Sequence, residues 1–255
     1  MLAFGGLGDT ILDDGAAYNP EQDTWRKLPD APIGGVADHA MVWTGEQMVV
    51  FGGRISATNN VYTASGAEYL PKAAIWREIP KSPLSPRQDP AIVWTGEEVI
   101  IWGGVGGDGW LADGAAYSPA TRSWRTIAPS PLDPRQAPLM VWTGGQVLVV
   151  GGTANVEQFA VGAAAYNPDN DSWSEISGPV DTSWGVGAWT SELLIDYGGL
   201  AVFDGRSWGE LAAPPPSIGS VPTATWTGNE LILLGGEAHP ETPTDAAFSL
   251  EYRKR

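Results

Sequence analysis

Two arginines, Arg87 and Arg135, stand in near-identical segments at residues 85–90 and 133–138. Each is followed by a glutamine, and each lies seven residues before a tryptophan. The planar guanidinium group is a fork-shaped donor that matches a carboxylate in two parallel hydrogen bonds. An acidic sugar or an acidic peptide is therefore a candidate ligand for this pair. The alternative is that each arginine pairs with a neighbouring aspartate or with a loop carbonyl.

A second group of polar candidates lies near Trp43. Asp38 and His39 precede Trp43 by five and four residues, and Arg54 directly follows a pair of glycines. A carboxylate, an imidazole and a guanidinium group are the side chains that a binding or catalytic site draws on most often. We expect them near a ligand, while the alternative for His39 is an ordinary loop histidine.

Two tryptophans complete the set of candidates. Trp184 occupies the position that corresponds to Asp38, and Trp110 lies in a long loop predicted over residues 105–113. An exposed tryptophan beside an arginine is a common anchor in interfaces, although either ring is also suited to packing its own loop. The predicted ligand-binding residues are Arg54, Arg87, Arg135, Trp110, Trp184, Asp38 and His39.

Composition excludes several kinds of chemistry. The chain has no cysteine, which removes disulfides, thiolate metal sites and cysteine nucleophiles. It has only two histidines, and we find no spacing typical of a Ser/His/Asp set, a phosphate loop or a metal site. Residues 169–171 resemble the start of a calcium loop but lack its later ligands, so a turn is predicted there. We therefore predict no catalytic residues, no metal and no cofactor.

The charge of the chain limits its partners. It carries 30 acidic and 14 basic residues, a net charge of −16. Binding to a phosphate backbone or to an anionic membrane needs clustered lysine and arginine, so nucleic acid and such membranes are poor partners. No run of apolar residues is long enough to predict a membrane span.

The elements that must position these side chains come from an internal repeat. Six pairs of glycines recur at intervals of 37 to 51 residues, a period typical of propeller blades. In five of the six repeats a tryptophan stands nine residues before the first glycine. The glycine pairs begin at Gly5, Gly52, Gly103, Gly151, Gly198 and Gly235.

Each repeat predicts four short strands, which we name A to D in chain order. Strand A ends in the tryptophan, and strand B is continuously apolar, as in residues 48–51 and 147–150. A continuously apolar strand is expected to be covered on both faces. Strand C carries an aromatic residue and strand D a second tryptophan, and we expect the two tryptophan columns to pack as wedges between neighbouring sheets.

These features resemble the kelch repeat. The resemblance rests on the apolar strand that ends in Gly-Gly, on a Tyr-x-Pro segment such as residues 18–20, and on a tryptophan seven residues after that tyrosine in four repeats. It is strongest to the bacterial kelch-like branch that shares the galactose-oxidase-type propeller. The copper chemistry of that branch is excluded, because it needs a cysteine.

The resemblance implies an all-β, six-bladed kelch-type β-propeller. We predict one domain over residues 1–255, with blades at about 1–34, 35–85, 86–133, 134–181, 182–217 and 218–255. The first blade begins on strand B and the last ends on strand C, so both are expected to be incomplete, with a gap or a weak contact between them.

Kelch domains serve mainly as interaction platforms, which implies a non-catalytic module that presents a rim of loops to a protein or glycan ligand. The alternative is a sugar-active enzyme, epimerase-like or lyase-like, that uses the mouth of the channel. A third reading is a structural repeat of a larger surface protein. The resemblance also implies an extracytoplasmic location in a bacterium. We expect the chain to be monomeric or part of a longer one.

Overall fold

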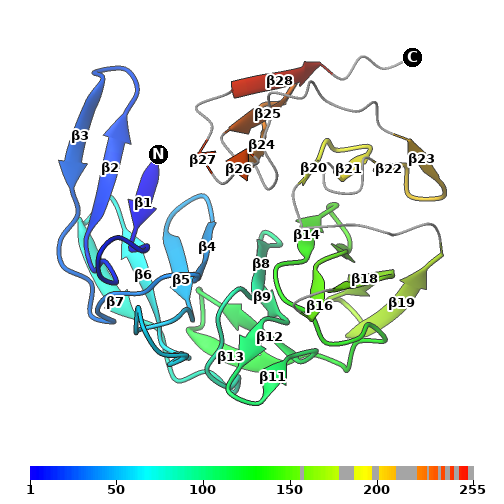
Figure 1. Ribbon diagram of the computed structural model, residues 1–255, viewed down its shortest axis with the longest axis horizontal. Coiled ribbons are helices and arrows are strands. Elements are labelled where there is room, and N and C mark those ends of the chain that lie inside the picture. The colour runs from blue at the N-terminus through cyan, green and yellow to red at the C-terminus, as the bar shows by residue number, and fades with distance from the viewer. Residues whose placement is uncertain are drawn as a thin grey trace. The chain divides into compact units, whose positions relative to one another are not determined.

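The computed structural model of the protein describes residues 1–155, 158–177, 187–196, 201–210, 223–228, 230–234, 237–238, 242–243 and 247–251. Antiparallel strands and turns make up this part of the chain, which contains no helix, and the predicted all-β class is confirmed (Figure 1). The chain falls into two compact units. The first comprises Met1–Ser130 with Pro134–Gln136, and the second comprises Pro131–Asp133 with Ala137–Arg255. The prediction of a single domain with a seam between its ends stays a prediction.

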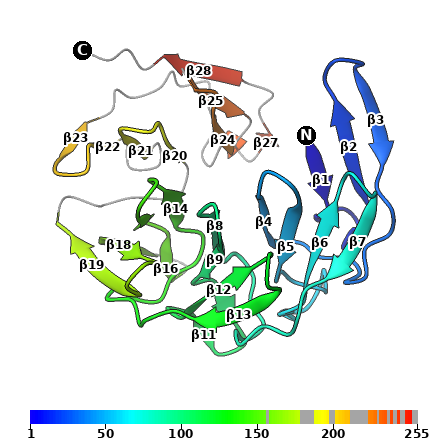
Figure 2. The same cartoon turned by 180° about the vertical axis from the view of Figure 1, so that it is seen from behind.

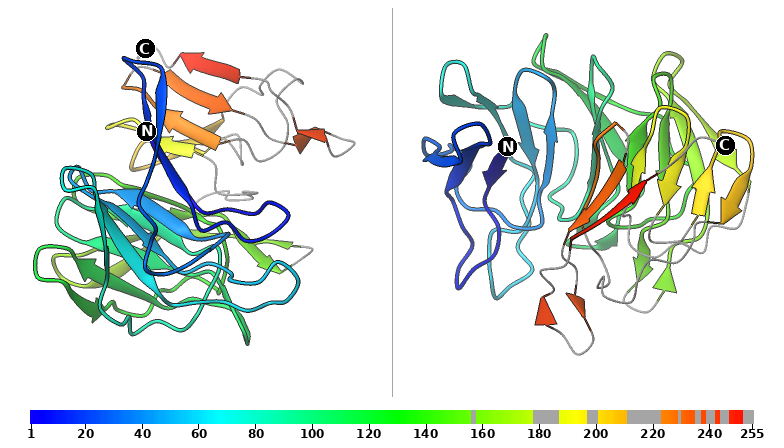
Figure 3. Two further views of the ribbon diagram at one scale, coloured as in Figure 1. Left: turned by 90° about the vertical axis from the view of Figure 1, so that its left-hand side faces the viewer. Right: turned by 90° about the horizontal axis from the view of Figure 1, so that it is seen from above.

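The first unit contains three sheets in which consecutive strands pair as neighbours. Their order can be followed from behind in Figure 2, and Figure 3 shows the first sheet in dark blue beside the second in lighter blue and cyan. The first sheet comprises β1 (Leu2–Phe4), β2 (Gly15–Asn19) and β3 (Thr24–Lys27), and the second comprises β4 (Ala40–Trp43), β5 (Met48–Phe51), β6 (Gly66–Leu70) and β7 (Ile75–Glu78). The third comprises β8 (Ala91–Trp94), β9 (Val99–Trp102), β12 (Gly114–Ser118) and β13 (Ser123–Thr126). The hairpin of β10 (Val105–Gly106) and β11 (Gly109–Trp110) lies between β9 and β12 in the chain.

The second unit repeats this arrangement. Its first sheet comprises β14 (Leu139–Trp142), β15 (Val147–Val150), β18 (Ala163–Asn167) and β19 (Ser172–Ile176). Its second comprises β20 (Gly187–Trp189), β21 (Leu194–Asp196), β22 (Ala201–Phe203) and β23 (Trp208–Glu210), and its third comprises β24 (Thr223–Trp226), β25 (Glu230–Leu234) and β28 (Ala247–Glu251). The second unit also has two hairpins. One is β16 (Thr153–Asn155) with β17 (Gln158–Phe159), between β15 and β18, and the other is β26 (Glu237–Ala238) with β27 (Thr242–Pro243), between β25 and β28.

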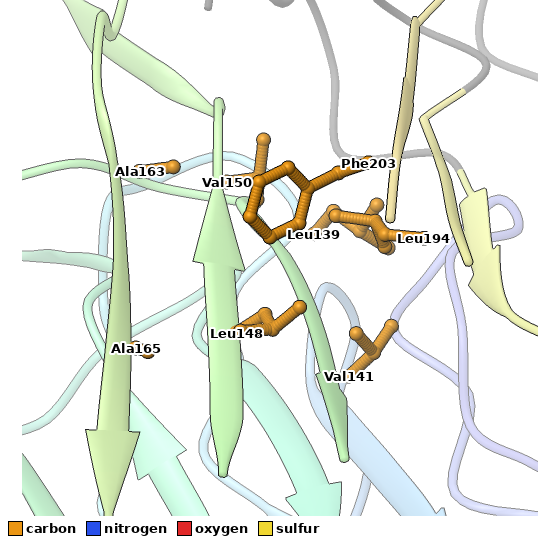
Figure 4. Packing of buried hydrophobic residues seen from close by; sticks show 8 residues of the cluster. All are labelled: Leu139, Val141, Leu148, Val150, Ala163, Ala165, Leu194 and Phe203. Atoms are coloured by element: carbon orange, nitrogen blue, oxygen red, sulfur yellow. The ribbon is translucent and has the colours of Figure 1, made fainter. Parts of the chain in front are cut away.

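The predicted strand B is fully buried in three of the described sheets. Every side chain of β5, β9 and β15 is buried, because each strand lies inside its sheet and neighbouring sheets cover it. In the second unit, side chains of β14, β15 and β18 meet Leu194 of β21 and Phe203 of β22 in one apolar cluster (Figure 4). Apolar burial of this kind stabilises by about 25 cal/mol per Å² and holds adjacent sheets together.

Two strand-D tryptophans act as the predicted wedges in the first unit. The Trp76 ring lies 4.8 Å from the Phe4 ring of the preceding sheet, and its Nε1 donates a 2.9 Å hydrogen bond to the carbonyl of Pro29. Trp124 lies 5.6 Å from Phe51 and donates a 2.9 Å hydrogen bond to the carbonyl of Pro80 in the same way. Each indole therefore joins its sheet to the sheet before it by both packing and a hydrogen bond.

The wedge prediction is wrong for two other tryptophans. Trp25 of β3 is 56% exposed and Trp43 of β4 is 49% exposed. In the first unit, Trp25 belongs to the first sheet, so no earlier sheet of that unit covers its ring. Trp43 instead lines an apolar groove with Met1, Leu2 and Met41.

Among the residues that the structure describes, none belongs to a helix with the length and apolar character that crossing a bilayer requires.

Candidate functional site

Three loop segments of the first unit bring four polar side chains together. Asp38 and His39 lie just before β4, Asp89 lies just before β8, and Arg54 follows the glycine pair at the end of β5. Backbone hydrogen bonds fix the segments to one another. Ala37 and Arg54 exchange N–H···O bonds of 3.0 and 2.7 Å, and the Asp89 N–H donates to the Asp38 carbonyl at 2.8 Å. We call Asp38, His39, Arg54 and Asp89 the loop cluster.

A glycine makes this close approach of loops feasible. Gly53 has a φ of 100°, and a Cβ atom there would lie 2.6 Å from the Ala37 carbonyl oxygen and 2.9 Å from the His39 Cβ. Both values are below any ordinary contact distance, so only glycine fits without moving the loop that carries Asp38 and His39. The Gly-Gly pattern of the sequence thus has a direct role in positioning the loop cluster.

The two aspartates occupy equivalent turn positions in successive sheets. Asp38 has a φ of 53° and Asp89 a φ of 48°, in the left-handed region that aspartate tolerates better than most residues. Ala137 has a φ of 46° at the corresponding position of the next repeat. Backbone geometry therefore favours a short side chain at this position, and the aspartates add charge to it.

Arg54 and Asp38 form a short ion pair. Arg54 Nε donates to Asp38 Oδ2 at 2.6 Å, and the two side chains are 23% and 34% exposed. Within the described part of the chain, the terminal nitrogens of Arg54 make no hydrogen bond of their own. The ion pair therefore uses Nε alone and leaves the donors of the two terminal nitrogens unused within the described residues.

Asp89 titrates unusually. Burial, followed by the negative charge of Asp38, raises the pKa of the Asp89 carboxyl to about 6, and these effects outweigh a 3.1 Å hydrogen bond from Gln88 Nε2 and the charge of Arg54. The carboxyl is therefore ionised at pH 7.5 and protonated at pH 5. The net charge of the loop cluster changes by one unit between these pH values.

His39 has an apolar environment. Burial lowers its pKa, against the raising effects of a hydrogen bond with the Val36 backbone and of the Asp38 charge. Its ring lies 6.0 Å from the Phe4 ring in an edge-on arrangement. The imidazole is therefore neutral at pH 7, and much of it packs against the first sheet.

The structure places Arg87 inside the protein, away from the exposed rim expected from the sequence. Its side chain has no exposed surface, and its terminal nitrogens hold the two carboxylate oxygens of Asp113 at 2.9 and 3.0 Å. It also donates to the Gly103 carbonyl at 3.0 Å and to both oxygens of Ser85. Arg87 therefore pairs with an aspartate and loop carbonyls, which is the alternative to ligand binding that the sequence left open.

Arg135 is 1% exposed, so it too lies in the interior and not at an exposed rim. Its backbone repeats the contacts of Arg87. The Arg135 carbonyl accepts the Gly104 N–H at 2.8 Å, as the Arg87 carbonyl accepts the Gly53 N–H at 2.8 Å. Both arginines are thus positioning residues for the loops that follow strand B, and direct ligand contact by either stays a prediction.

The two predicted tryptophan anchors are Trp110 and Trp184. Trp110 lies on β11 and is partly buried, and its Nε1 is buried with no hydrogen-bond partner in the described part of the chain. Trp184 lies outside the described residues. A ligand role for either stays a prediction.

Sequence reasoning missed two members of this region. Asp89 was detectable, since it stands at the same distance before its tryptophan as Asp38 does. Asp113 was not, because it lies 26 residues after Arg87 and only the fold brings the two together. Within the described residues, no group of three or more histidine, aspartate or glutamate side chains has the arrangement of a metal site.

Comparison with known proteins agrees with this architecture. A family model described as the KLHDC2/KLHL20/DRC7 Kelch-repeats domain matches residues 1–186. A solved structure described as "Structure of YjhT" is similar with a TM-score of 0.69 and 14% identity, covering 96% of this chain and 93% of that chain. A search of curated proteins gives no match. The similarity to YjhT shows the fold alone, whereas the family model spans most of the sequence, and the chain therefore belongs to the kelch-repeat family of β-propellers.

Proposed function

We propose that the protein is a binding module that holds a protein or glycan ligand at the loop cluster, with Arg54 as the central contact. Membership of the kelch-repeat family supports a binding or interaction role in general. The observation that carries the more specific proposal is the Arg54–Asp38 ion pair, which uses Nε alone and leaves the donors of the two terminal nitrogens unused within the described residues. Rigid sheets with function on their loops suit such a role.

The chemistry of the loop cluster defines what the ligand must present. Arg54 offers donors, so the ligand supplies oxygen acceptors such as hydroxyl, carbonyl or carboxylate groups. Asp38 and Asp89 offer acceptors close by, which suits ligand hydroxyl or amide groups. Because Asp89 loses its charge below about pH 6, an acidic ligand binds more tightly at pH 5 than at pH 7.5.

An array of neutral glycans, acidic glycans and acidic peptides tests this proposal. Wild type, Arg54→Ala and Lys27→Ala are compared on it. Lys27 forms an exposed ion pair with Asp30, so its substitution removes one positive charge away from the loop cluster. We expect a ligand that wild type and Lys27→Ala retain and that Arg54→Ala loses. A ligand bound equally by all three variants contradicts the proposal.

A second candidate function is a sugar-active enzyme. The pKa of Asp89 is raised and the pKa of His39 is lowered, a divergence typical of acid–base pairs at active sites. Incubation with glucuronic and galacturonic acids and their methyl glycosides, followed by NMR, decides between the two functions. Conversion that is lost in the Asp89→Asn variant favours the enzyme, and unchanged sugars favour the binding module.

A further inference from the structure

The second unit contains a hollow between the sheet β14-β15-β18-β19 and the sheet β20-β21-β22-β23. Its volume is about 600 Å³, within the range of small-molecule sites. Its floor is apolar and includes Leu148, Ala165 and Phe203. Its walls include Trp189, Ser174 and Arg206.

The corresponding interface of the first unit also has a hollow, of about 580 Å³, but beside it lies a buried carboxylate where the other repeats carry alanine or valine. There, the fully buried carboxylate of Glu68 on β6 accepts hydrogen bonds from Gln47 Nε2 at 3.0 Å and from the Tyr117 hydroxyl at 2.7 Å. Arg77 donates to the same carboxylate from Nε and Nη2, at 2.8 and 2.6 Å. A buried charge is tolerated only with such partners. We call Gln47, Glu68, Arg77 and Tyr117 the carboxylate network.

Strand register identifies the residues at the same places in the second unit. Glu68 pairs with Arg77 across β6 and β7, and Ala165 pairs with Ser174 across β18 and β19. These two pairs occupy the same place in their sheets. The carboxylate and the guanidinium group are therefore replaced by a methyl group and a hydroxymethyl group.

Of the other two members of the network, the tyrosine has an apolar counterpart and the glutamine is kept. Tyr117 and Phe203 each pair with the strand-D tryptophan of their own sheet, so Phe203 lacks the hydroxyl group that binds Glu68. Gln146 keeps the place of Gln47, and a threonine hydroxyl accepts the backbone N–H of each at 3.1 Å. The second unit therefore keeps the amide and lacks the carboxylate, the guanidinium group and the phenol hydroxyl of the carboxylate network.

Polar groups surround the opening of this hollow. Gln146, Ser174 and Glu175 line it from the first of its two sheets, and Arg206 lines it from the turn between β22 and β23. That turn is well formed, because Asp204 Oδ1 accepts the N–H groups of Arg206 and Ser207 at 2.8 and 2.7 Å. The opening thus offers an amide, hydroxyl groups, one carboxylate and one guanidinium group around an apolar floor.

We propose that this hollow binds a neutral sugar ring. A pyranose has apolar C–H faces, which fit the Phe203 and Leu148 floor and the partly buried indole of Trp189. Its hydroxyl groups both donate and accept, which matches a rim of mixed donors and acceptors. A ligand of single charge is disfavoured, because Glu175 and Arg206 carry opposite signs. This site lies in the second unit and is independent of the function proposed for the loop cluster.

The test uses protein labelled with 5-fluorotryptophan, with the Trp189 resonance assigned through a Trp189→Phe variant. Methyl glycosides of glucose, galactose, mannose and N-acetylglucosamine are titrated to about 10 mM, well above the dissociation constant of about 1 mM expected for a single sugar. We expect at least one glycoside to shift the Trp189 resonance saturably. The absence of any such shift, or a shift caused by p-cresol and by no glycoside, overturns the proposal.

Two variants and one control establish the location. The triple variant A165E/S174R/F203Y transfers the carboxylate network into the hollow and is expected to abolish the shift. Arg206→Ala is expected to weaken binding roughly tenfold, while Lys72→Ala, which removes an exposed cation from the β6–β7 turn of the first unit, leaves it unchanged. Undiminished binding by Arg206→Ala overturns the proposal even where the triple variant does not fold. Variants of Arg54 play no part in this test, so its outcome is separate from that of the loop cluster.

Discussion

Tyr117 donates a 2.7 Å hydrogen bond from its hydroxyl group to the fully buried carboxylate of Glu68, which belongs to the preceding sheet. This bond joins two sheets of the first unit through a charge. Burial and the hydrogen bond to Glu68 together raise the pKa of the Tyr117 hydroxyl. The interface between these sheets therefore depends on a polar group inside an otherwise apolar cluster.

Removal of this hydroxyl tests its contribution to stability. We expect Tyr117→Phe to lower the free energy of unfolding by about 2 kcal/mol, the cost of taking one hydrogen bond from a buried charged group. Urea denaturation measures the change. Tyr18→Phe is the matched control, because the Tyr18 hydroxyl bonds to Asp23 at 2.8 Å in an exposed setting and its loss should have little effect. Equal losses in the two variants would show that the buried bond has no special value.

The raised pKa of Asp89 predicts a pH-dependent stability. A carboxyl whose pKa is higher in the folded than in the unfolded state favours folding at pH 4, and this contribution is lost as the pH rises through about 6. Asp89→Asn removes the dependence and tolerates the same left-handed backbone. We expect the variant to match wild type at pH 4 and to be more stable at pH 7.5 by about 2 kcal/mol. Thermal unfolding at both pH values tests this, and parallel pH profiles for the two proteins would be inconsistent with it.

The bidentate pair between Arg87 and Asp113 predicts that lysine is a poor substitute. Lysine cannot hold both carboxylate oxygens and also reach the Gly103 carbonyl, so Arg87→Lys should lower the free energy of unfolding by about 2 kcal/mol. Arg206→Lys, on an exposed turn, is the control and should cost less than about 0.5 kcal/mol. Chemical denaturation of the two variants compares these costs. An Arg87→Lys variant as stable as wild type would refute a positioning role for this guanidinium group.

The Gly53 contacts predict a coupled loss of stability and of the loop cluster. Gly53→Ala adds a methyl group against the Ala37 carbonyl and the His39 Cβ, and should cost more than about 2 kcal/mol. Gly45→Ala is the matched control, because Gly45 has a similar φ of 92° but open space around it. Its cost should stay near 1 kcal/mol, the cost of the backbone conformation alone. Calorimetric unfolding that ranks the two variants equally would argue against steric crowding at Gly53.

The periodic residues made the sheets predictable. Tryptophan, the glycine pair and the strand-C aromatic recur at fixed spacing, so the strand order within each sheet follows from the sequence. The exposure of Trp25 could not be read in this way, because a repeat pattern does not say whether another sheet covers its first member. Glu68 was detectable from the sequence, because it places a carboxylate where the other repeats carry alanine or valine.

The candidate site was predictable only in part. Asp38, His39 and Arg54 were identified, and the structure brings them together with Asp89. Arg87 was expected at an exposed rim because it lies in a segment that joins strand D of one repeat to strand A of the next. Its partner Asp113 lies 26 residues further along the chain, so no local sequence pattern indicates the contact. Long-range pairing of charges depends on strand register, which a single sequence does not supply.

The affinity of Arg54 variants for the ligand selected on the array tests the account most directly. Isothermal titration calorimetry at pH 7.5 should show binding by wild type and a loss of about 30-fold in Arg54→Ala, equivalent to about 2 kcal/mol. Arg54→Lys should recover only part of that loss, because it keeps the charge but not the fork. Equal dissociation constants for wild type and Arg54→Ala, with both proteins folded, would contradict the proposed role of the loop cluster.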